Sequence, residues 1–151
     1  MKQHELWILS GLPGSGKSTW AQQQEGNWIS RDTIRFAKIN DSDSYFSQEK
    51  EVFKEYVNEV QKSIRKNKVT YADATHLNWA SRRKLLRALK LENVEVGVIE
   101  FNTPIEVCKQ RNSTRTGRAR VPDDVIENMY ASMTSASEDP YPYSKIISIG
   151  G

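Results

Sequence analysis

Residues 11–20 read GLPGSGKSTW and directly follow the apolar run LWIL at 6–9. From Gly11 to Ser18 they match the pattern G-x-x-x-x-G-K-[ST], in which a glycine-rich turn points backbone amides at phosphate oxygens. An apolar run before such a turn is typical of a strand buried on both faces of a parallel sheet, and a helix should begin at Lys17. The stretch therefore predicts a strand, a phosphate-binding loop and a helix that together hold a nucleoside triphosphate.

Each residue type in this loop has a task in binding ATP and Mg²⁺. Lys17 is expected to reach the terminal phosphates and the Ser18 hydroxyl to hold the metal, while Thr19 assists from the next position. The alternative is a glycine turn that caps a helix and binds nothing. The residues of the loop expected to contact the nucleotide are Gly11, Pro13, Gly14, Ser15, Gly16, Lys17, Ser18 and Thr19.

The rest of the chain alternates expected strands with expected helices, which predicts an α/β fold. We expect a doubly wound parallel sheet of about five strands with helices on both faces, formed by a single domain over residues 1–151. Gly26 should end the first helix as a left-handed cap, and Thr103 should cap a later helix in a capping box with Glu106. Strands are expected at about 6–9, 27–30, 68–73, 94–101 and 145–149, and helices at about 17–25, 47–66, 82–90, from 103 onward and from 122 onward, with a polar loop at 40–44.

Composition sets limits on the partners. The chain has 22 Lys and Arg against 19 Asp and Glu, a net charge of +3 that permits a polyanionic partner without requiring one. Cys108 is the only cysteine, so no internal disulfide or zinc site is expected, and the reducing cytoplasm is the expected location. The short apolar run near the N-terminus predicts neither a signal peptide nor a membrane partner. No pattern indicates an oligomeric state.

Two aspartates lie at the C-terminal ends of expected strands, Asp32 just after the second and Asp73 at the third, and should face the loop. The carboxyl ends of parallel strands meet at one edge of a sheet, which brings Asp32 and Asp73 near the bound phosphates. Asp73 is expected near Mg²⁺, and Asp32 is expected to accept a proton from an attacking hydroxyl. The alternatives are that Asp32 only caps the helix beginning at TIRFA and that Asp73 only forms a turn beside Thr75.

A basic segment, RNSTRTGRAR at residues 111–120, lies between two expected helices. It carries Arg111, Arg115, Arg118 and Arg120 around Gly117 and predicts a mobile arginine lid over about 111–121. Guanidinium groups placed there would stabilise negative charge on a phosphoryl group during transfer. The alternative is a solvated basic loop.

Several of these segments recur together in one family. GLPGSGKSTWA, SRDTIR, YADATHLN, the pair Arg82 and Arg83, and RNSTR followed by VPDDVIENMYASM appear in the same order in the 5′-hydroxyl polynucleotide kinases of bacteriophage type. The chain resembles that family of P-loop kinases from Leu6 to about Met133.

The resemblance implies roles for individual residues. It implies that Asp32, Lys17 and Arg115 are catalytic, with Asp32 as the general base and Arg115 as the lid arginine on the nucleotide phosphates. Arg35 is implied to hold a phosphate of the acceptor strand, and Asp73 is implied to be essential. The resemblance also implies nucleotide contact by Arg111, acceptor contact by Asp32, Asp73 and Arg82, and metal contact by Ser18 and Asp73. The lid has one more residue before Val121 than the family's, so Arg118 and Arg120 receive no role.

The expected function is transfer of the γ-phosphate of ATP to the 5′-hydroxyl end of DNA or RNA. We expect no 3′-phosphatase domain, because the pattern D-x-D-G-T is absent. Two alternatives have the same nucleotide site: a kinase of a small metabolite or nucleotide sugar with an enclosed acceptor pocket, and an ATPase that nucleic acid stimulates and that transfers nothing.

Overall fold

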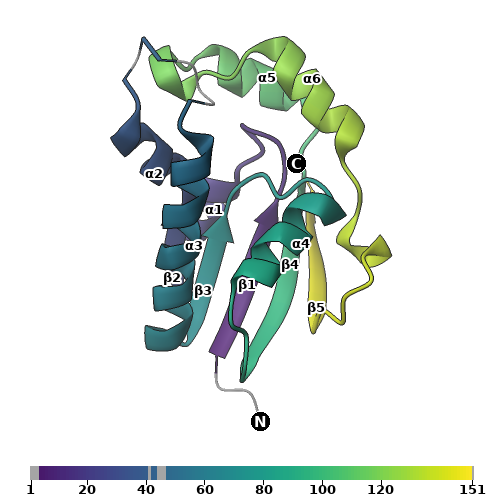
Figure 1. Cartoon of the computed structure of the whole chain (residues 1–151). Helices are drawn as coiled ribbons and strands as arrows, with labels where there is room; N and C mark the ends of the chain where they lie inside the picture. Colours follow the sequence, from purple (N-terminus) through teal and green to yellow (C-terminus); the bar gives the residue numbers. More distant parts are fainter. Residues whose placement is uncertain (1–3, 41, 44–46, 151) are drawn as a thin grey trace.

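A parallel sheet forms the centre of the molecule in the computed structural model (Figure 1), which describes residues 4–40, 42–43 and 47–150. Within these residues the sheet has five strands in the spatial order β2-β3-β1-β4-β5, and every neighbouring pair is parallel, as predicted. The polar loop expected at 40–44 lies partly outside the described residues. The strands are β1 His4–Ser10, β2 Asn27–Ser30, β3 Val69–Asp73, β4 Val94–Asn102 and β5 Lys145–Gly150.

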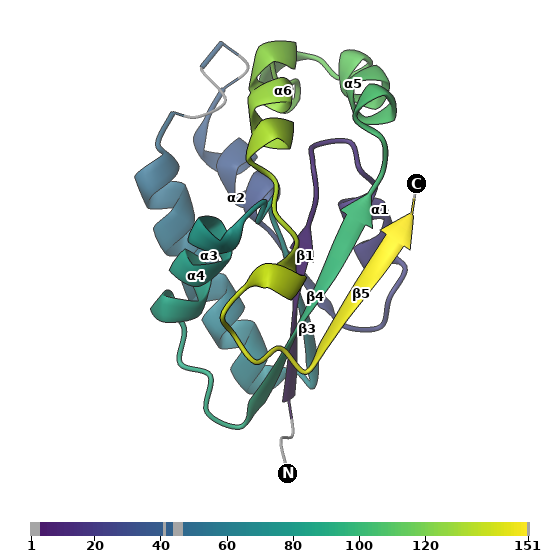
Figure 2. The same ribbon diagram turned by 90° about the vertical axis from the view of Figure 1, so that its right-hand side faces the viewer.

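Helices cover both faces of this sheet, which confirms the predicted architecture. α3 and α4 lie on one face and α1 on the other, whereas α5 and α6 lie beyond the carboxyl ends of the strands (Figures 1 and 2). None of the described helices combines the length and the hydrophobicity needed to span a lipid bilayer. The helices are α1 Lys17–Gln22, α2 Arg31–Lys38, α3 Glu49–Lys66, α4 Trp79–Ala88, α5 Ile105–Ser113 and α6 Asp123–Ser132, with short 3₁₀ turns at Gly117–Ala119 and Ala136–Glu138.

The core explains why β1 is continuously apolar. Leu6 and Ile8 pack in the layer of α3 and α4, where Tyr56 belongs to the same cluster. Leu9 faces the opposite layer and packs in a cluster with Ala21 of α1. Because both faces of β1 are covered, successive side chains are apolar instead of alternating with polar ones. The strand therefore carries the phosphate-binding loop on a rigid base.

The sequence-based expectation for Gly26 is wrong. α1 ends at Gln22, and Gly26 is not among the glycines with positive φ. A Cβ atom at Gly26 would lie 2.4 Å from the ring of Tyr71, so this glycine is needed for close packing against β3.

The expected capping box at Thr103 is also absent. Pro104, not Thr103, is the N-cap of α5, and no side chain caps that helix. The Thr103 hydroxyl instead donates to the carbonyl oxygen of Ser15 at 2.8 Å. The threonine therefore holds the phosphate-binding loop against the start of α5.

α2 begins directly after β2 and brings Asp32 to the edge of the sheet. Ser30 is its N-cap, and its hydroxyl accepts a hydrogen bond from the backbone N–H of Thr33 at 3.1 Å. The alternative in which Asp32 is the helix cap is therefore wrong. Asp32 lies in the first turn, where its side chain faces the space above the strands.

Candidate active site

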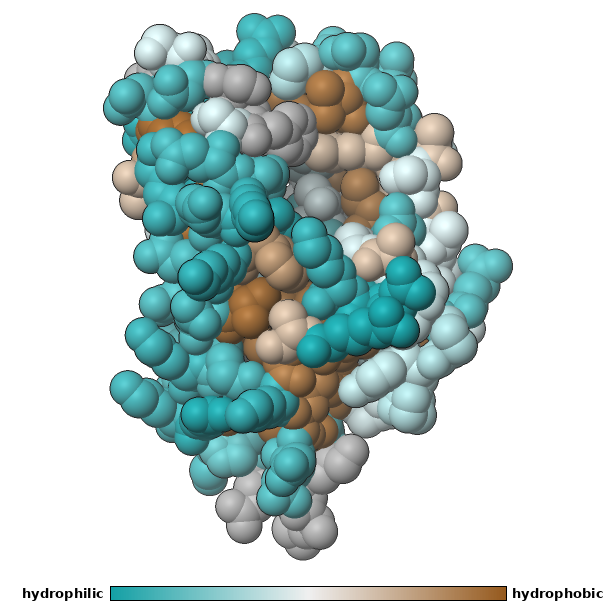
Figure 3. Space-filling model, in the orientation of Figure 1, coloured by the Kyte–Doolittle hydropathy of each residue, from teal (hydrophilic) through white to brown (hydrophobic). Residues whose placement is uncertain are grey.

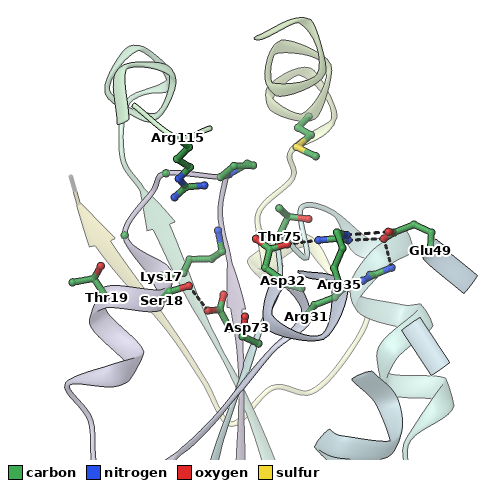
Figure 4. A pocket seen from close by; sticks show the side chains of 16 residues that line it. Lys17, Ser18, Thr19, Arg31, Asp32, Arg35, Glu49, Asp73, Thr75 and Arg115 are labelled. Atoms are coloured by element: carbon green, nitrogen blue, oxygen red, sulfur yellow. Dashed lines mark hydrogen bonds and ion pairs between the residues drawn. The ribbon is translucent and has the colours of Figure 1, made fainter. Parts of the chain in front are cut away.

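A cavity of about 330 Å³ opens at the carboxyl ends of the strands (Figure 4). The loop at residues 11–18, called the phosphate loop below, contributes Pro13, Gly14, Gly16, Lys17 and Ser18 to its walls, and the start of α2 and the end of β3 form the rest. Glu49, Arg115 and Met129 close it from α3, the lid and α6. Most of the residues predicted for the site are thus brought together in one place.

The phosphate loop is curled around the ammonium group of Lys17. The Lys17 Nζ donates to the carbonyl oxygens of Gly11 and Leu12, each at 2.9 Å. Burial lowers the pKa of Lys17, and the carboxylates of Asp73 and Asp32 oppose that shift. The ammonium group is therefore held by neutral oxygens at the cavity wall, from which it can turn to an anionic ligand.

Two glycines give this loop its shape. Gly14 has φ +82° and Gly16 has φ +98°, which are left-handed conformations that favour glycine. A Cβ atom at Gly14 would also lie 2.7 Å from the carbonyl oxygen of Cys108. The loop is held from the other side by Arg111, whose Nη1 donates to the carbonyl oxygen of Gly14 at 3.0 Å. Arg111 thus contacts the loop that was predicted to bind the nucleotide.

Asp73 accepts two hydrogen bonds on one oxygen. Its Oδ2 atom lies 2.6 Å from the Ser18 hydroxyl and 2.8 Å from Nε1 of Trp28, which both donate to it. A hydroxyl and a carboxylate side by side suit Mg²⁺, which takes oxygen ligands and completes its shell with water and substrate phosphates. In the described part of the chain no three His, Cys, Asp or Glu residues gather as a metal site, so Mg²⁺ here would rely on those further ligands.

Asp32 belongs to a network of charged side chains on the opposite wall. It pairs with Arg35, whose guanidinium also donates to both Glu49 oxygens at 2.6 and 3.0 Å. Glu49 in turn accepts from Arg31 at 2.8 Å. The Arg35 side chain is 6% exposed and that of Asp32 is 43% exposed, so the carboxylate faces the cavity while the arginine is held behind it (Figure 4).

The sequence analysis assigned no site role to Glu49, which lines the cavity, or to Trp28, which contacts Asp73. Glu49 was predicted only to lie in the first turn of a helix, and Trp28 only to lie in the second strand. Their functional contacts join Glu49 to Arg35 and Trp28 to Asp73, pairs that lie 14 and 45 residues apart in the sequence. No local pattern indicates such pairs, because the fold alone brings them together.

The lid segment is closed at its base by a buried side chain. The Asn112 amide group donates to the Val121 carbonyl oxygen at 2.6 Å and accepts from its N–H at 3.0 Å. Arg115 lines the cavity beside the phosphate loop, whereas Arg118 lies over the ring of Phe36 on α2, 5.7 Å from its centre. Arg120 is exposed. The segment therefore reaches across the cavity from α5 to α2.

Arg82, expected to contact the acceptor, lies elsewhere and requires a correction. Its side chain is fully buried and donates to both Asp139 oxygens at 2.6 and 3.0 Å, and to the His76 carbonyl oxygen at 2.8 Å. Because this guanidinium is buried and bound to Asp139, Arg82 ties α4 to the loop before β5. Its neighbour Arg83 is exposed.

We expect Arg82→Ala to lower the free energy of unfolding by about 3 to 5 kcal/mol, because it leaves the buried Asp139 carboxylate with the Tyr143 hydroxyl but without its charged partner. Chemical denaturation measures the change. The control is Arg83→Ala on the exposed side of α4, which should stay within about 0.5 kcal/mol of wild type. Equal stability of both variants would show that the buried ion pair does not hold the fold together.

Comparisons with known proteins agree with this architecture. A family described as AAA domain matches residues 6–139. The structure of the Pnkp1/Rnl/Hen1 RNA repair complex contains a chain that is 25% identical over 87% of this chain, with a TM-score of 0.68. The match spans 44% of that chain, so less than half of the RNA repair protein is represented.

Two further structures extend the comparison to nearly the whole chain. Kti12 from Chaetomium thermophilum in complex with ADP-AlF3 is 18% identical, with a TM-score of 0.66, and the match covers 96% of this chain and 88% of that one. A sugar kinase from Janibacter sp. is 17% identical, with a TM-score of 0.61, and the match covers 98% of this chain and 85% of the sugar kinase chain. The chain has the fold of the P-loop kinases.

Proposed function

We propose that this chain, which belongs to the AAA domain family over residues 6–139, is a kinase. In this proposal it transfers the γ-phosphate of ATP to the 5′-hydroxyl end of DNA or RNA. One observation carries the proposal: Asp32 and Arg35 lie one turn apart on α2 and both line the cavity that the phosphate loop also lines. An acid next to a guanidinium suits an acceptor that presents a hydroxyl group and a phosphate close together. We also propose that the protein acts in the cytoplasm, because its single cysteine cannot form an internal disulfide and suits a reducing compartment.

In the proposed reaction the acceptor hydroxyl attacks the γ-phosphorus in line with the bond to the β-phosphate. Asp32 accepts the hydroxyl proton while the new O–P bond forms and the bond to ADP breaks. Lys17 and Arg115 stabilise the negative charge on the transferred group from two sides. Ser18 and Asp73 would hold Mg²⁺, which supplies positive charge beside the phosphates.

The RNA repair complex supports a nucleic acid acceptor, whereas the sugar kinase has the same fold with another acceptor class. Acceptor competition separates these functions. γ-labelled ATP is incubated with 5′-hydroxyl DNA and RNA oligonucleotides, with free nucleosides and with sugars. The proposal predicts that oligonucleotides become labelled and that nucleosides and sugars compete poorly. A sugar or a nucleoside as the best acceptor would contradict it.

Arg35→Ala is expected to remove the preference for an acceptor that carries a phosphate next to the reacting nucleoside. For a nucleoside 3′-phosphate, kcat/KM should fall about 10- to 100-fold, because a charge-assisted contact of about 1.5 to 3 kcal/mol is lost. For the plain nucleoside the fall should be several-fold smaller. The control is Lys38→Ala in the last turn of α2, which does not line the cavity and pairs with Glu55. Equal losses with both acceptors would rule out phosphate contact by Arg35.

A further inference from the structure

We propose that a groove between α3 and α4 binds the acceptor strand on the 3′ side of its reacting end. This inference rests on the proposed function, because it extends the path of that same acceptor beyond the cavity. We use the name α3–α4 groove for the surface between these two helices that carries the partly buried Phe53 and Val57 and the exposed Lys50, Lys54 and Lys84.

The groove begins at the cavity wall. Phe53 of α3 lies between two cations, with the Arg31 guanidinium carbon 5.2 Å and the Lys84 Nζ 4.4 Å from the centre of its ring. Arg31 lines the cavity, whereas Lys84 is exposed on α4. The side chains of Arg31, Phe53 and Lys84 thus form a continuous path from the cavity to the outer surface.

One face of α3 follows this path. Gln61 exchanges two hydrogen bonds with the backbone of Lys90 just after α4, at 3.2 and 2.7 Å, so the Gln61 face of α3 points to α4. Lys50, Lys54 and Val57 precede Gln61 by 11, 7 and 4 residues, spacings that place all four on the same helix face. Both lysines are exposed.

Glu55 of α3 lies on the side away from α4, whereas Glu49 lies at the cavity end of the groove, where it accepts from Arg31 at 2.8 Å. Glu55 pairs with Lys38 of α2 at 3.4 Å, away from α4, and Glu51 precedes it by one turn. In the described part of the chain, Lys50, Lys54 and Lys84 form no ion pair with a carboxylate. Beyond the cavity end, Lys50, Lys54 and Lys84 therefore give the groove positive charge, while Glu55 pairs on the opposite side of α3.

The composition of the groove selects a single strand of nucleic acid as its occupant. Figure 3 shows hydrophobic atoms between the hydrophilic surfaces of α3 and α4, on the face that Figure 1 presents. Exposed lysines beside a partly buried apolar surface suit the phosphates of a single strand, whose sugars and bases can lie against that surface. An acidic protein segment could also pair with the three lysines, but it would have no reason to follow a surface that leads into the phosphate-transfer cavity. From Lys50 to Gln61 the helix rises by about 16 Å, enough for a few nucleotides.

Direct binding tests the groove without requiring catalysis. Fluorescence polarisation measures Kd for a labelled single-stranded 12-nucleotide DNA and the same sequence in RNA at several salt concentrations. The double variant Lys54→Ala/Lys84→Ala should bind about tenfold more weakly, and its slope of log Kd against log salt should be smaller by about 1.4, or about 0.7 for each lost phosphate contact. The matched control is Lys62→Ala, an exposed lysine of α3 outside the groove.

Transfer kinetics then separate this inference from the proposed function. In the double variant, the ratio of kcat/KM for the 12-nucleotide acceptor to that for a nucleoside 3′-phosphate should fall about tenfold. If oligonucleotide binding depends on Lys54 and Lys84 but no phosphate is transferred, the groove is supported and the proposed kinase activity is wrong. If the double variant transfers phosphate with the wild-type ratio and the wild-type salt slope, the kinase activity is supported and the groove is wrong. Tighter binding of an acidic peptide than of the oligonucleotide would also contradict the groove.

Discussion

Asp32→Asn is expected to lower the rate of phosphate transfer about a thousandfold while it leaves the affinity for ATP within about threefold of wild type. Loss of a general base costs about 10²- to 10⁴-fold, and asparagine keeps the size of the side chain but cannot accept the hydroxyl proton. The ATP phosphates are assigned to the phosphate loop and to Arg115, which this substitution does not touch. Single-turnover transfer at saturating acceptor and ATP titration give the two values.

The matched control for this prediction is Asp124→Asn, an exposed carboxylate in the first turn of α6. It removes one negative charge, as Asp32→Asn does, but from the lid side of the molecule. It should leave the transfer rate and the affinity for ATP unchanged. If Asp32→Asn transfers phosphate at the wild-type rate, another group accepts the proton and the assignment of the base is wrong. Weakened ATP binding with an unchanged transfer rate would place Asp32 at the nucleotide instead.

Lys17→Met should weaken both ATP binding and catalysis, with kcat/KM for ATP lower by about 10²- to 10³-fold. Methionine fills a similar volume but lacks the charge that stabilises the transferred group. It also removes the hydrogen bonds from Lys17 to the carbonyl oxygens of Gly11 and Leu12, of which Leu12 keeps the Ser15 N–H as a donor, so the free energy of unfolding should fall by about 1 to 3 kcal/mol.

Thermal unfolding and ATP titration separate the two effects of Lys17→Met. The control Lys62→Met removes an exposed lysine from α3, and neither ATP affinity nor Tm should change. A Lys17→Met protein that is less stable but binds and uses ATP normally would restrict Lys17 to a structural role in the loop.

The parts of the site that were predicted are those encoded by neighbouring residues. The phosphate loop follows from glycine spacing, because positive φ at Gly14 and Gly16 is a local requirement. The positions of Asp32 and Asp73 follow from the rule that parallel strands end at one edge. In each case a few consecutive residues and one general property of the fold are sufficient.

The parts that were not predicted depend on contacts between distant segments. Thr103 reaches Ser15 across 88 residues, and its local sequence fits a helix cap equally well. Arg82 lies in a basic helix whose other charges are exposed, and only its pairing with Asp139, 57 residues away, makes it a buried residue. Sequence patterns report the type of side chain, whereas tertiary packing decides which partner that side chain meets.

The most direct test of the kinase is the fate of the γ-phosphate. Wild-type protein, ATP labelled at the γ-phosphate and a 5′-hydroxyl oligonucleotide are mixed, and ADP, free phosphate and labelled 5′ ends are counted in the same sample. Transfer by Asp32 and the phosphate loop predicts one labelled 5′ end for each ADP formed, and almost no label when the oligonucleotide already carries a 5′-phosphate. Free phosphate equal to ADP, with unlabelled ends, would contradict the account and identify an ATPase.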